Sequence, residues 1–131
     1  MGITAGTKKA HIVRALLEGL AFRIKDLFVT INTGPNQIKS PIKIDGGVSR
    51  NDFVVQFLAD LLNVEILRPE NVEMTTQGAA FMVALQLGWH SKEDLKKKYK
   101  IGKIFSPGSF IDNNEAQKLY DEWLSYCKRV I

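Results

Sequence analysis

The stretch of residues 42–62 constrains the fold of this chain more than any other. It reads IKIDGGVSRNDFVVQFLADLL, in which a short apolar run ends in Asp45-Gly46-Gly47 and an amphipathic helix begins near Asn51. Adjacent glycines permit positive φ angles and leave the backbone of a turn open to close approach. Free N–H groups at the start of the helix favour an anion or the polar edge of a ring. Strand, glycine turn and helix is how α/β proteins build nucleotide sites at the carboxyl ends of their strands.

A second short apolar run, residues 64–67, follows this helix and is closed by Arg68-Pro69. Strand 42–45, helix 51–62 and strand 64–67 make a βαβ unit, so we expect the two strands to be parallel with a right-handed crossover. Residues 103–105 are a weaker candidate for a third strand. Because a two-stranded parallel sheet is a poor independent fold, the sequence predicts an α/β fold that is part of a larger sheet domain.

Apolar periodicity predicts a long first helix from about His11 to Ile31. Its apolar stripe, expected to be core, consists of Val13, Leu16, Leu17, Leu20, Ile24, Leu27, Phe28 and Ile31. A third helix, from Thr75 to Leu87, is apolar nearly all round, which predicts burial on more than one side. Gly88 is expected to stop that helix.

Two helices are predicted in the last third of the chain. Ser91 and Asp94 have the spacing of a capping box, which starts a short helix that runs to about Lys98. The last helix is expected from about Asn113 to Val130. Its apolar stripe is Ala116, Leu119, Tyr120, Trp123, Cys127 and Val130.

The composition indicates an ordinary soluble protein. The chain has 131 residues, 45% hydrophobic and 24% charged, with a net charge of +4. Much of the basic excess lies in residues 96–100, which we interpret as a solvated patch and not a nucleic-acid site. The single cysteine, Cys127, excludes a disulfide framework within one chain and fits the reducing cytoplasm. No apolar run approaches the length of a membrane span, so no membrane partner is expected.

The stretches GITAGTKKAHIVRALLEGLAF and IDGGVSRNDFVVQFLADLL resemble the C-terminal signature and the adenosine-binding turn of the FGGY carbohydrate kinases. RPENVEMTTQGAAFMVALQLGW is similar to the strand end and helix that follow in that family. The tail, with FSPG and then LYDEW, is also similar. Within the family, the forms GITAGT, AHIVRALLEG and TTQGAA resemble those of the glycerol kinases.

The resemblance implies two actin-like (RNase H-like) domains around a cleft, and transfer of the γ-phosphoryl group of ATP, with Mg²⁺, to a polyol or sugar hydroxyl. Residues 1–131 would be a single partial domain, the distal half of the second, nucleotide-binding domain. Gly46 and Gly47 would form the side of the site facing the adenosine and α-phosphate. Asn51 would hydrogen-bond the adenine. The helix of residues 75–84 would lie near the connection between the domains.

The resemblance also implies absences. The first domain, its phosphate-binding hairpin, the polyol site and the general base have no counterpart here, so no catalytic residue and no metal ligand is assigned to this chain. The expected partners are ATP or ADP, the missing N-terminal kinase domain, and glycerol or a related polyol in the parent protein, with a homo-oligomer possible. Because phosphoryl transfer needs several such elements at once, we expect the chain alone to be inactive.

The sequence is also compatible with other functions and with simpler roles for the turn residues. The chain is alternatively a stand-alone binding module derived from the kinase fold, another FGGY sugar kinase, or a basic nucleic-acid binder with steeply salt-dependent binding. Gly46-Gly47 alone is compatible with a plain tight turn, and Asp45 with a turn or capping role more than a metal site. Asn51 is most simply an N-cap, a role compatible with contacting a base.

Three further residues receive structural interpretations. His11 is expected to act in packing or capping because no carboxylate or nucleophile is spaced to work with it. Arg14 and Glu18 have the spacing of an ion pair on a helix.

Overall fold

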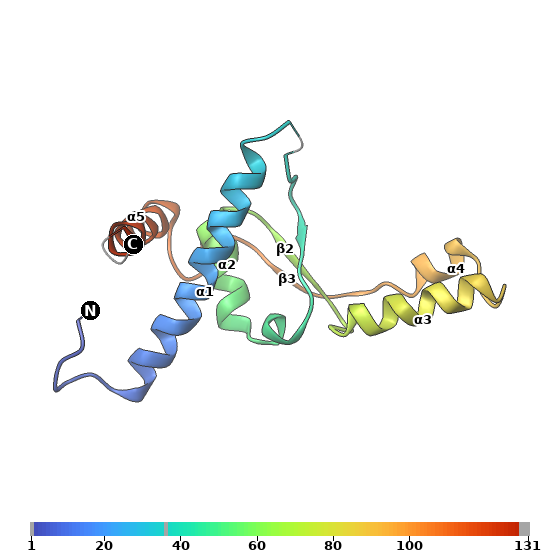
Figure 1. Ribbon diagram of the computed structural model, residues 1–131, viewed down its shortest axis with the longest axis horizontal. Helices are drawn as coiled ribbons and strands as arrows, with labels where there is room; N and C mark the ends of the chain where they lie inside the picture. Colours follow the sequence, from blue (N-terminus) through green and yellow to red (C-terminus); the bar gives the residue numbers. More distant parts are fainter. Residues whose placement is uncertain (1, 36, 129–131) are drawn as a thin grey trace.

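The computed structural model describes residues 2–35 and 37–128. A small sheet carries helices on one side, and a helical arm extends away from it (Figure 1). The elements in chain order are α1 (Lys9–Asn32), β1 (Ile42–Lys43), the 3₁₀ turn η1 (Gly47–Arg50), α2 (Asp52–Leu62), β2 (Ile66–Pro69), α3 (Met74–Gln86), α4 (Lys92–Lys97), β3 (Ile101–Phe105) and α5 (Asn113–Cys127).

The sheet has the order β1-β2-β3, with β2 at its centre. β1 pairs with β2 in parallel, with Ile42 opposite Ile66, which confirms the parallel pair of the predicted βαβ unit. β2 lies two residues later than predicted, because Arg68 and Pro69, expected to close the strand, continue it and pair with β3. β1 is shorter than expected, although the Ile44 N–H still donates to the Leu67 carbonyl at 3.0 Å. The weak candidate at residues 103–105 is a strand, and β3 runs antiparallel to β2. The α/β class is therefore confirmed, with a mixed sheet where only the parallel pair was predicted.

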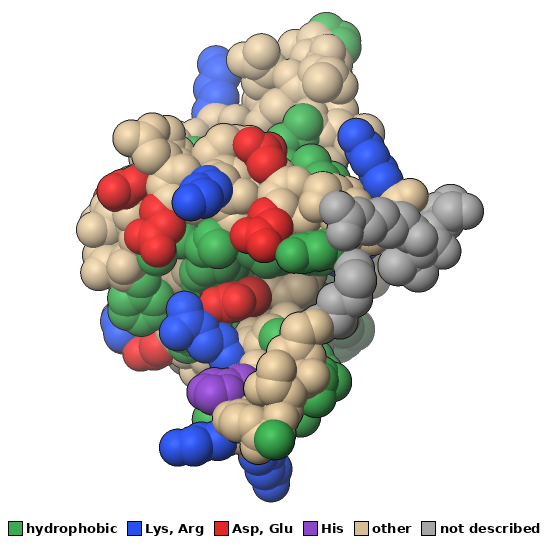
Figure 2. Space-filling view, turned by 90° about the vertical axis from the view of Figure 1, so that its left-hand side faces the viewer, with side chains coloured by type: hydrophobic (Ala, Val, Ile, Leu, Met, Phe, Trp, Pro, Cys, Tyr) green, Lys and Arg blue, Asp and Glu red, His purple; other side chains and the backbone are tan. Residues whose placement is uncertain are grey.

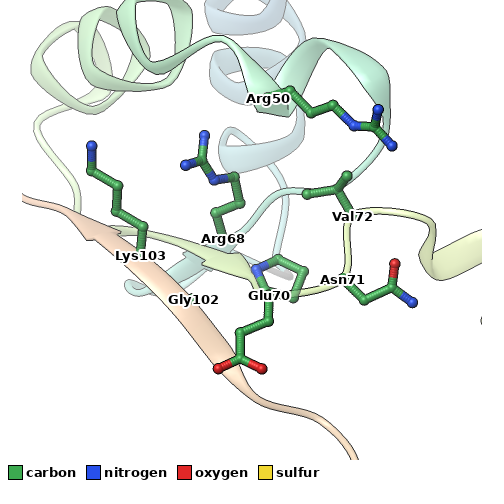
Figure 3. Close-up of a pocket in the computed structure, with 8 residues that line it drawn as sticks. Arg50, Arg68, Glu70, Asn71, Val72, Gly102 and Lys103 are labelled. Carbon is green, nitrogen blue, oxygen red and sulfur yellow. The ribbon is translucent and has the colours of Figure 1, made fainter.

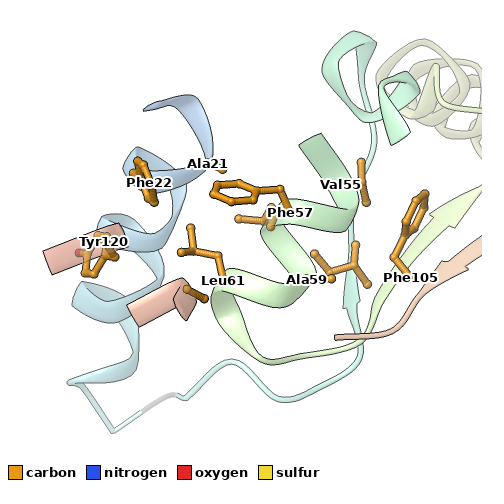
Figure 4. Packing of buried hydrophobic residues seen from close by; sticks show 11 residues of the cluster. Ala21, Phe22, Val55, Phe57, Ala59, Leu61, Phe105 and Tyr120 are labelled. Atoms are coloured by element: carbon orange, nitrogen blue, oxygen red, sulfur yellow. The ribbon is translucent and has the colours of Figure 1, made fainter. Parts of the chain in front are cut away.

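The core lies where α2 packs against the sheet, α1 and α5 (Figure 4). Phe57 of α2 is 1% exposed and meets Phe22 of α1 edge to face, with ring centroids 5.6 Å apart. Phe22 also lies against Tyr120 and Trp123 of α5. The apolar stripe predicted for the last helix thus helps to close the core, while its member Val130 lies outside the described residues.

A buried carboxylate joins α2 to the loop before α5. Asp60 is 1% exposed, and its Oδ1 accepts hydrogen bonds from the N–H groups of Gly108 (2.8 Å) and Ser109 (3.2 Å). Its Oδ2 accepts from the N–H groups of Phe110 (2.9 Å) and Ile111 (3.2 Å). The sequence did not indicate this role, because nothing in α2 distinguishes Asp60 from a surface aspartate.

The long first helix is confirmed, but the expectation that its whole apolar stripe is core is wrong among the described residues. The residues of α1 that are buried are Ala21, Phe22 and Lys25. Leu16 is 69% exposed and Leu27 is 62% exposed. α2 and α5 are the described helices that pack against α1, and they leave most of its apolar stripe exposed. Seen from the side of α5, the surface also shows apolar side chains among the charged ones (Figure 2).

The prediction that the third helix is buried on more than one side is also wrong. Ala84 is the only buried residue of α3, and Met82 is 70% exposed. The physical reason is that α3 and α4 project from the sheet as an arm, so no described element covers most of α3 (Figure 1). Gly88 has φ 70° directly after the helix, which confirms it as the stop. Ser91 caps α4 as predicted, with Asp94 completing the capping box.

The exposed stripe of α1 gives a first testable prediction. Replacing Leu16 and Leu27 together with glutamine should change the free energy of unfolding by less than about 1 kcal/mol, because neither side chain is packed. Self-association, measured by sedimentation velocity, should decrease because exposed apolar surface is removed. As a control, Phe22→Ala should cost about 3 kcal/mol or more, since Phe22 is buried. A comparable loss in the double variant would contradict the exposed position of the stripe.

A second prediction concerns pH and the contact between α1 and α5. The Tyr120 hydroxyl donates to Asp26, and burial together with that carboxylate raises the pKa of Tyr120 from 10.0 to about 12. Because the folded state favours the protonated phenol, its stabilisation is complete below pH 10.0 and is lost as the pH rises towards about 12. The free energy of unfolding of the wild type, measured in urea, should therefore fall over that window more than that of Tyr120→Phe. Parallel pH dependence of the two proteins would refute this linkage.

Candidate functional site

The glycine turn after β1 adopts a conformation that its first glycine makes possible. Gly46 has φ 85° and ψ 175°, a region that is essentially restricted to glycine. Its N–H donates to the Val72 carbonyl at 2.9 Å, which ties the turn to the segment after β2. The turn is therefore held from two directions, by β1 and by the loop that leads into α3.

Ser49 closes the turn from inside. It is fully buried, and both its Oγ (2.6 Å) and its N–H (3.1 Å) donate to the carbonyl of Gly46. These hydrogen bonds shape residues 47–50 into the single 3₁₀ turn η1, which leads directly into α2.

Gly47 has a different environment from Gly46. Its φ lies outside the left-handed region, and a Cβ built on it would meet nothing within 4 Å. The residue is exposed, so neither backbone strain nor packing among the described residues calls for glycine here. The space in front of Gly47 is open to a ligand or to another part of a protein.

Asn51 caps α2, which confirms the simpler of its two interpretations. Its Oδ1 accepts from the N–H groups of Phe53 (3.0 Å) and Val54 (3.3 Å). The residue is exposed, so a ligand beside the turn can reach its carboxamide. The same side chain can therefore cap the helix through its oxygen and donate to a ligand through its nitrogen.

A hollow of about 560 Å³ lies between η1 and the ends of β2 and β3 (Figure 3). Its lining residues are Arg50, Arg68, Pro69, Glu70, Asn71, Val72, Gly102 and Lys103. The basic side chains are all paired. Arg50 meets Glu73 at 2.5 Å, while Arg68 (2.7 Å) and Lys103 (2.5 Å) both meet Asp52. Lys103 and Arg68 lower the pKa of Asp52 through these contacts.

Other residues singled out in the sequence have structural roles. Nδ1 of His11 lies 3.3 Å from the backbone N of Lys8 and accepts from it at the start of α1, which fits capping. Arg14 and Glu18 form the predicted pair at 2.7 Å. Asp45 is exposed at the end of β1 and beside the turn. Sequence reasoning missed Arg68 and Val72, because a strand-closing Arg-Pro pair and a loop valine carry no signal of contact with the glycine turn.

Among residues 2–35 and 37–128, no group of three or more His, Cys, Asp or Glu side chains is placed to hold a metal ion. These residues therefore do not supply a three-ligand set for the Mg²⁺ that the family resemblance implies. None of the described helices combines the length and the apolar character needed to cross a membrane.

The strand, glycine turn and capped helix define an α/β protein with a turn open to a ligand, and comparison with known proteins gives the family. The model of the C-terminal domain of the FGGY family of carbohydrate kinases matches residues 1–87. The chain therefore belongs to the FGGY carbohydrate kinases. Its similar relatives include glycerol kinase 2 of Sulfolobus acidocaldarius, with 38% identity, and a glycerol kinase of Thermoanaerobacter sp. strain X514, with 36% identity. Each match covers all of this chain and 26% of the relative, so the chain spans about a quarter of their length.

Solved structures of sugar and glycerol kinases match the fold of this chain. The glycerol kinase of Plasmodium falciparum with ADP matches 98% of this chain and 26% of its own, with a TM-score of 0.79 and 27% identity. A ligand-bound xylulose kinase of Lactobacillus acidophilus matches 99% of this chain and 26% of its own, with a TM-score of 0.72 and 26% identity. The chain has part of the actin-like ATPase fold of these kinases.

Proposed function

We propose that this chain is the distal half of the nucleotide-binding domain of a glycerol kinase, which transfers the γ-phosphoryl group of ATP to glycerol. The observation that carries the proposal is the turn itself. Gly46 has a backbone conformation that requires glycine, while Gly47 is glycine without a local reason and faces open space. An outside group that must come close to the backbone accounts for that second glycine.

In this proposal, Gly46 and Gly47 face the adenosine and the α-phosphate of ATP. Asn51 donates from its carboxamide nitrogen to the adenine, while its oxygen continues to cap α2. The similarity to a glycerol kinase solved with ADP supports an adenine nucleotide as the ligand.

The rest of the kinase supplies the chemistry. The chain spans 26% of its glycerol kinase relatives, and phosphoryl transfer also needs phosphate-binding loops, a general base and Mg²⁺ ligands, which we assign to the remaining part of the kinase. We therefore infer that the chain alone is inactive and that its partner is the remaining part of an FGGY kinase in the cytoplasm. The exposed apolar faces of α1 and α3 fit this inference, because a larger domain would cover them.

The test uses a chimaera in which this chain replaces the matching segment of the Thermoanaerobacter glycerol kinase. The chimaera should phosphorylate glycerol with ATP. A folded but inactive chimaera would contradict the proposal.

Asn51→Asp then separates the two roles of Asn51. Aspartate caps a helix as well as asparagine does, but it has no NH₂ to donate. The KM for ATP should rise by about 10-fold or more, which is the effect of losing one hydrogen bond in a binding site, while the unfolding midpoint should stay unchanged. An unchanged KM for ATP would remove Asn51 from the proposed site.

A further inference from the structure

We propose that Arg68 is a positioning residue for the nucleotide. Its guanidinium holds Ser49 and Asp52, which lie on either side of Arg50 and Asn51 in the chain. The turn and Asn51 therefore face the ligand in a fixed geometry. This inference rests on the function proposed above and extends it to a residue that does not itself reach the ligand.

The contacts of Arg68 join the sheet to the turn. Its Nη1 donates to the backbone carbonyl of Ser49 at 2.7 Å and to Oδ1 of Asp52 at 2.7 Å. Ser49 is in η1, and Asp52 is the first residue of α2. One side chain of β2 therefore fixes the end of the turn and the beginning of the helix together.

Arg68 is itself held in place. Its side chain is 17% exposed, and its guanidinium carbon lies 5.2 Å from the centre of the Phe105 ring. Phe105 belongs to β3 and is 2% exposed, so its ring is held within the core. Arg68 and Lys103 both rise from the sheet towards the start of α2 (Figure 3). Neighbouring strands thus provide a rigid base for the guanidinium.

The hydrogen bonds form a chain that ends at the glycines. Arg68 holds the Ser49 carbonyl, and the Oγ and N–H of Ser49 hold the Gly46 carbonyl. Ser49 is fully buried, so removal of Arg68 leaves its carbonyl without this charged donor. The expected consequence is a looser turn, because the Ser49 carbonyl and the Asp52 side chain lose their link to β2. Small displacements of binding groups have large effects on ligand affinity and rate.

Lys103 provides a matched control. It meets the same carboxylate, Oδ2 of Asp52, and it also lies over the Phe105 ring, but its contacts do not include the Ser49 carbonyl. Removal of Lys103 therefore changes the charge beside Asp52 and leaves the hydrogen bond between Arg68 and the Ser49 carbonyl in place. Arg68→Lys keeps a cation in the same place, but an ammonium group lacks the planar fork of a guanidinium.

The first experiment measures amide hydrogen exchange in the 131-residue chain. Arg68→Ala should speed exchange of the Ser49 and Asn51 amides by about tenfold or more, whereas Lys103→Ala should leave them nearly unchanged. Arg68→Lys, which retains a cation beside Asp52, is expected to fold and to give an intermediate rate. Equal exchange in wild type, Arg68→Lys and Arg68→Ala would overturn the inference.

The second experiment uses the chimaera with the Thermoanaerobacter enzyme. Arg68→Ala should raise the KM for ATP by about tenfold or more and leave the KM for glycerol unchanged. Lys103→Ala should leave both values near those of the wild type. An inactive wild-type chimaera counts against the proposed function. An active wild-type chimaera whose Arg68→Ala variant keeps its KM for ATP, or loses affinity for both substrates equally, overturns the role of Arg68.

Discussion

Replacing Asp60 with alanine is expected to lower the free energy of unfolding of this chain by about 3 kcal/mol or more, a large part of the stability of a small domain. The carboxylate is 1% exposed and accepts from the backbone N–H groups of Gly108, Ser109, Phe110 and Ile111. It also accepts from Nε2 of Gln56 at 2.8 Å. Alanine leaves these donors without their acceptor and removes the attachment of the loop that leads into α5. Urea unfolding followed by circular dichroism measures the effect.

Two variants make the Asp60 experiment specific. Asp60→Asn keeps the shape of the side chain but points an NH₂ group at backbone N–H donors. It should therefore also lower the free energy of unfolding, by about 2 kcal/mol or more. Asp121→Ala removes an exposed aspartate of α5 and should change stability by less than about 0.5 kcal/mol. If Asp60→Ala unfolds at the same urea concentration as the wild type, the loop is not held by this carboxylate.

Replacing Gly47 with valine should reduce kcat/KM for ATP in the chimaera by about 100-fold or more, because the new side chain occupies the space into which the nucleotide is proposed to come. The fold should tolerate the change. A Cβ at Gly47 meets nothing within 4 Å, and its φ is not in the left-handed region. Steady-state kinetics and thermal unfolding of the same preparation measure both effects.

Gly46→Ala is the matched comparison for this prediction. Its Cβ also has open space, but φ 85° strains any other residue, at a cost of about 1 to 3 kcal/mol in stability. The two variants should therefore differ in stability, which is lost at Gly46 and kept at Gly47. Normal use of ATP by Gly47→Val would contradict the proposed approach of the nucleotide to this turn.

Local patterns in the sequence were enough to predict most elements. The cap at Asn51, the capping box at Ser91 and the stop at Gly88 depend on residues within one turn of each other, and each element of the βαβ unit is a contiguous run. The same is true of the Arg14–Glu18 pair. Such features are short-range, so neighbouring residues specify them without knowledge of the rest of the fold.

The apolar stripes show where this reasoning fails. Periodicity correctly made α1 and α3 helices, but it cannot say which neighbour covers which face. In α1 the covered side is the one that carries Ala21, Phe22 and Lys25, and in α3 almost nothing is covered. Burial depends on elements far away in the chain, or outside this stretch of it.

The sequence by itself determined the family, the order of helices and the glycine turn, because each is encoded in contiguous residues such as 42–62. Only the tertiary structure decided that Arg68 holds the turn, that Asp60 holds the loop before α5, and that β3 runs antiparallel to β2. These contacts join residues 16 to 51 positions apart. Their energies depend on burial and on exact partner geometry, which exist only after the chain has folded.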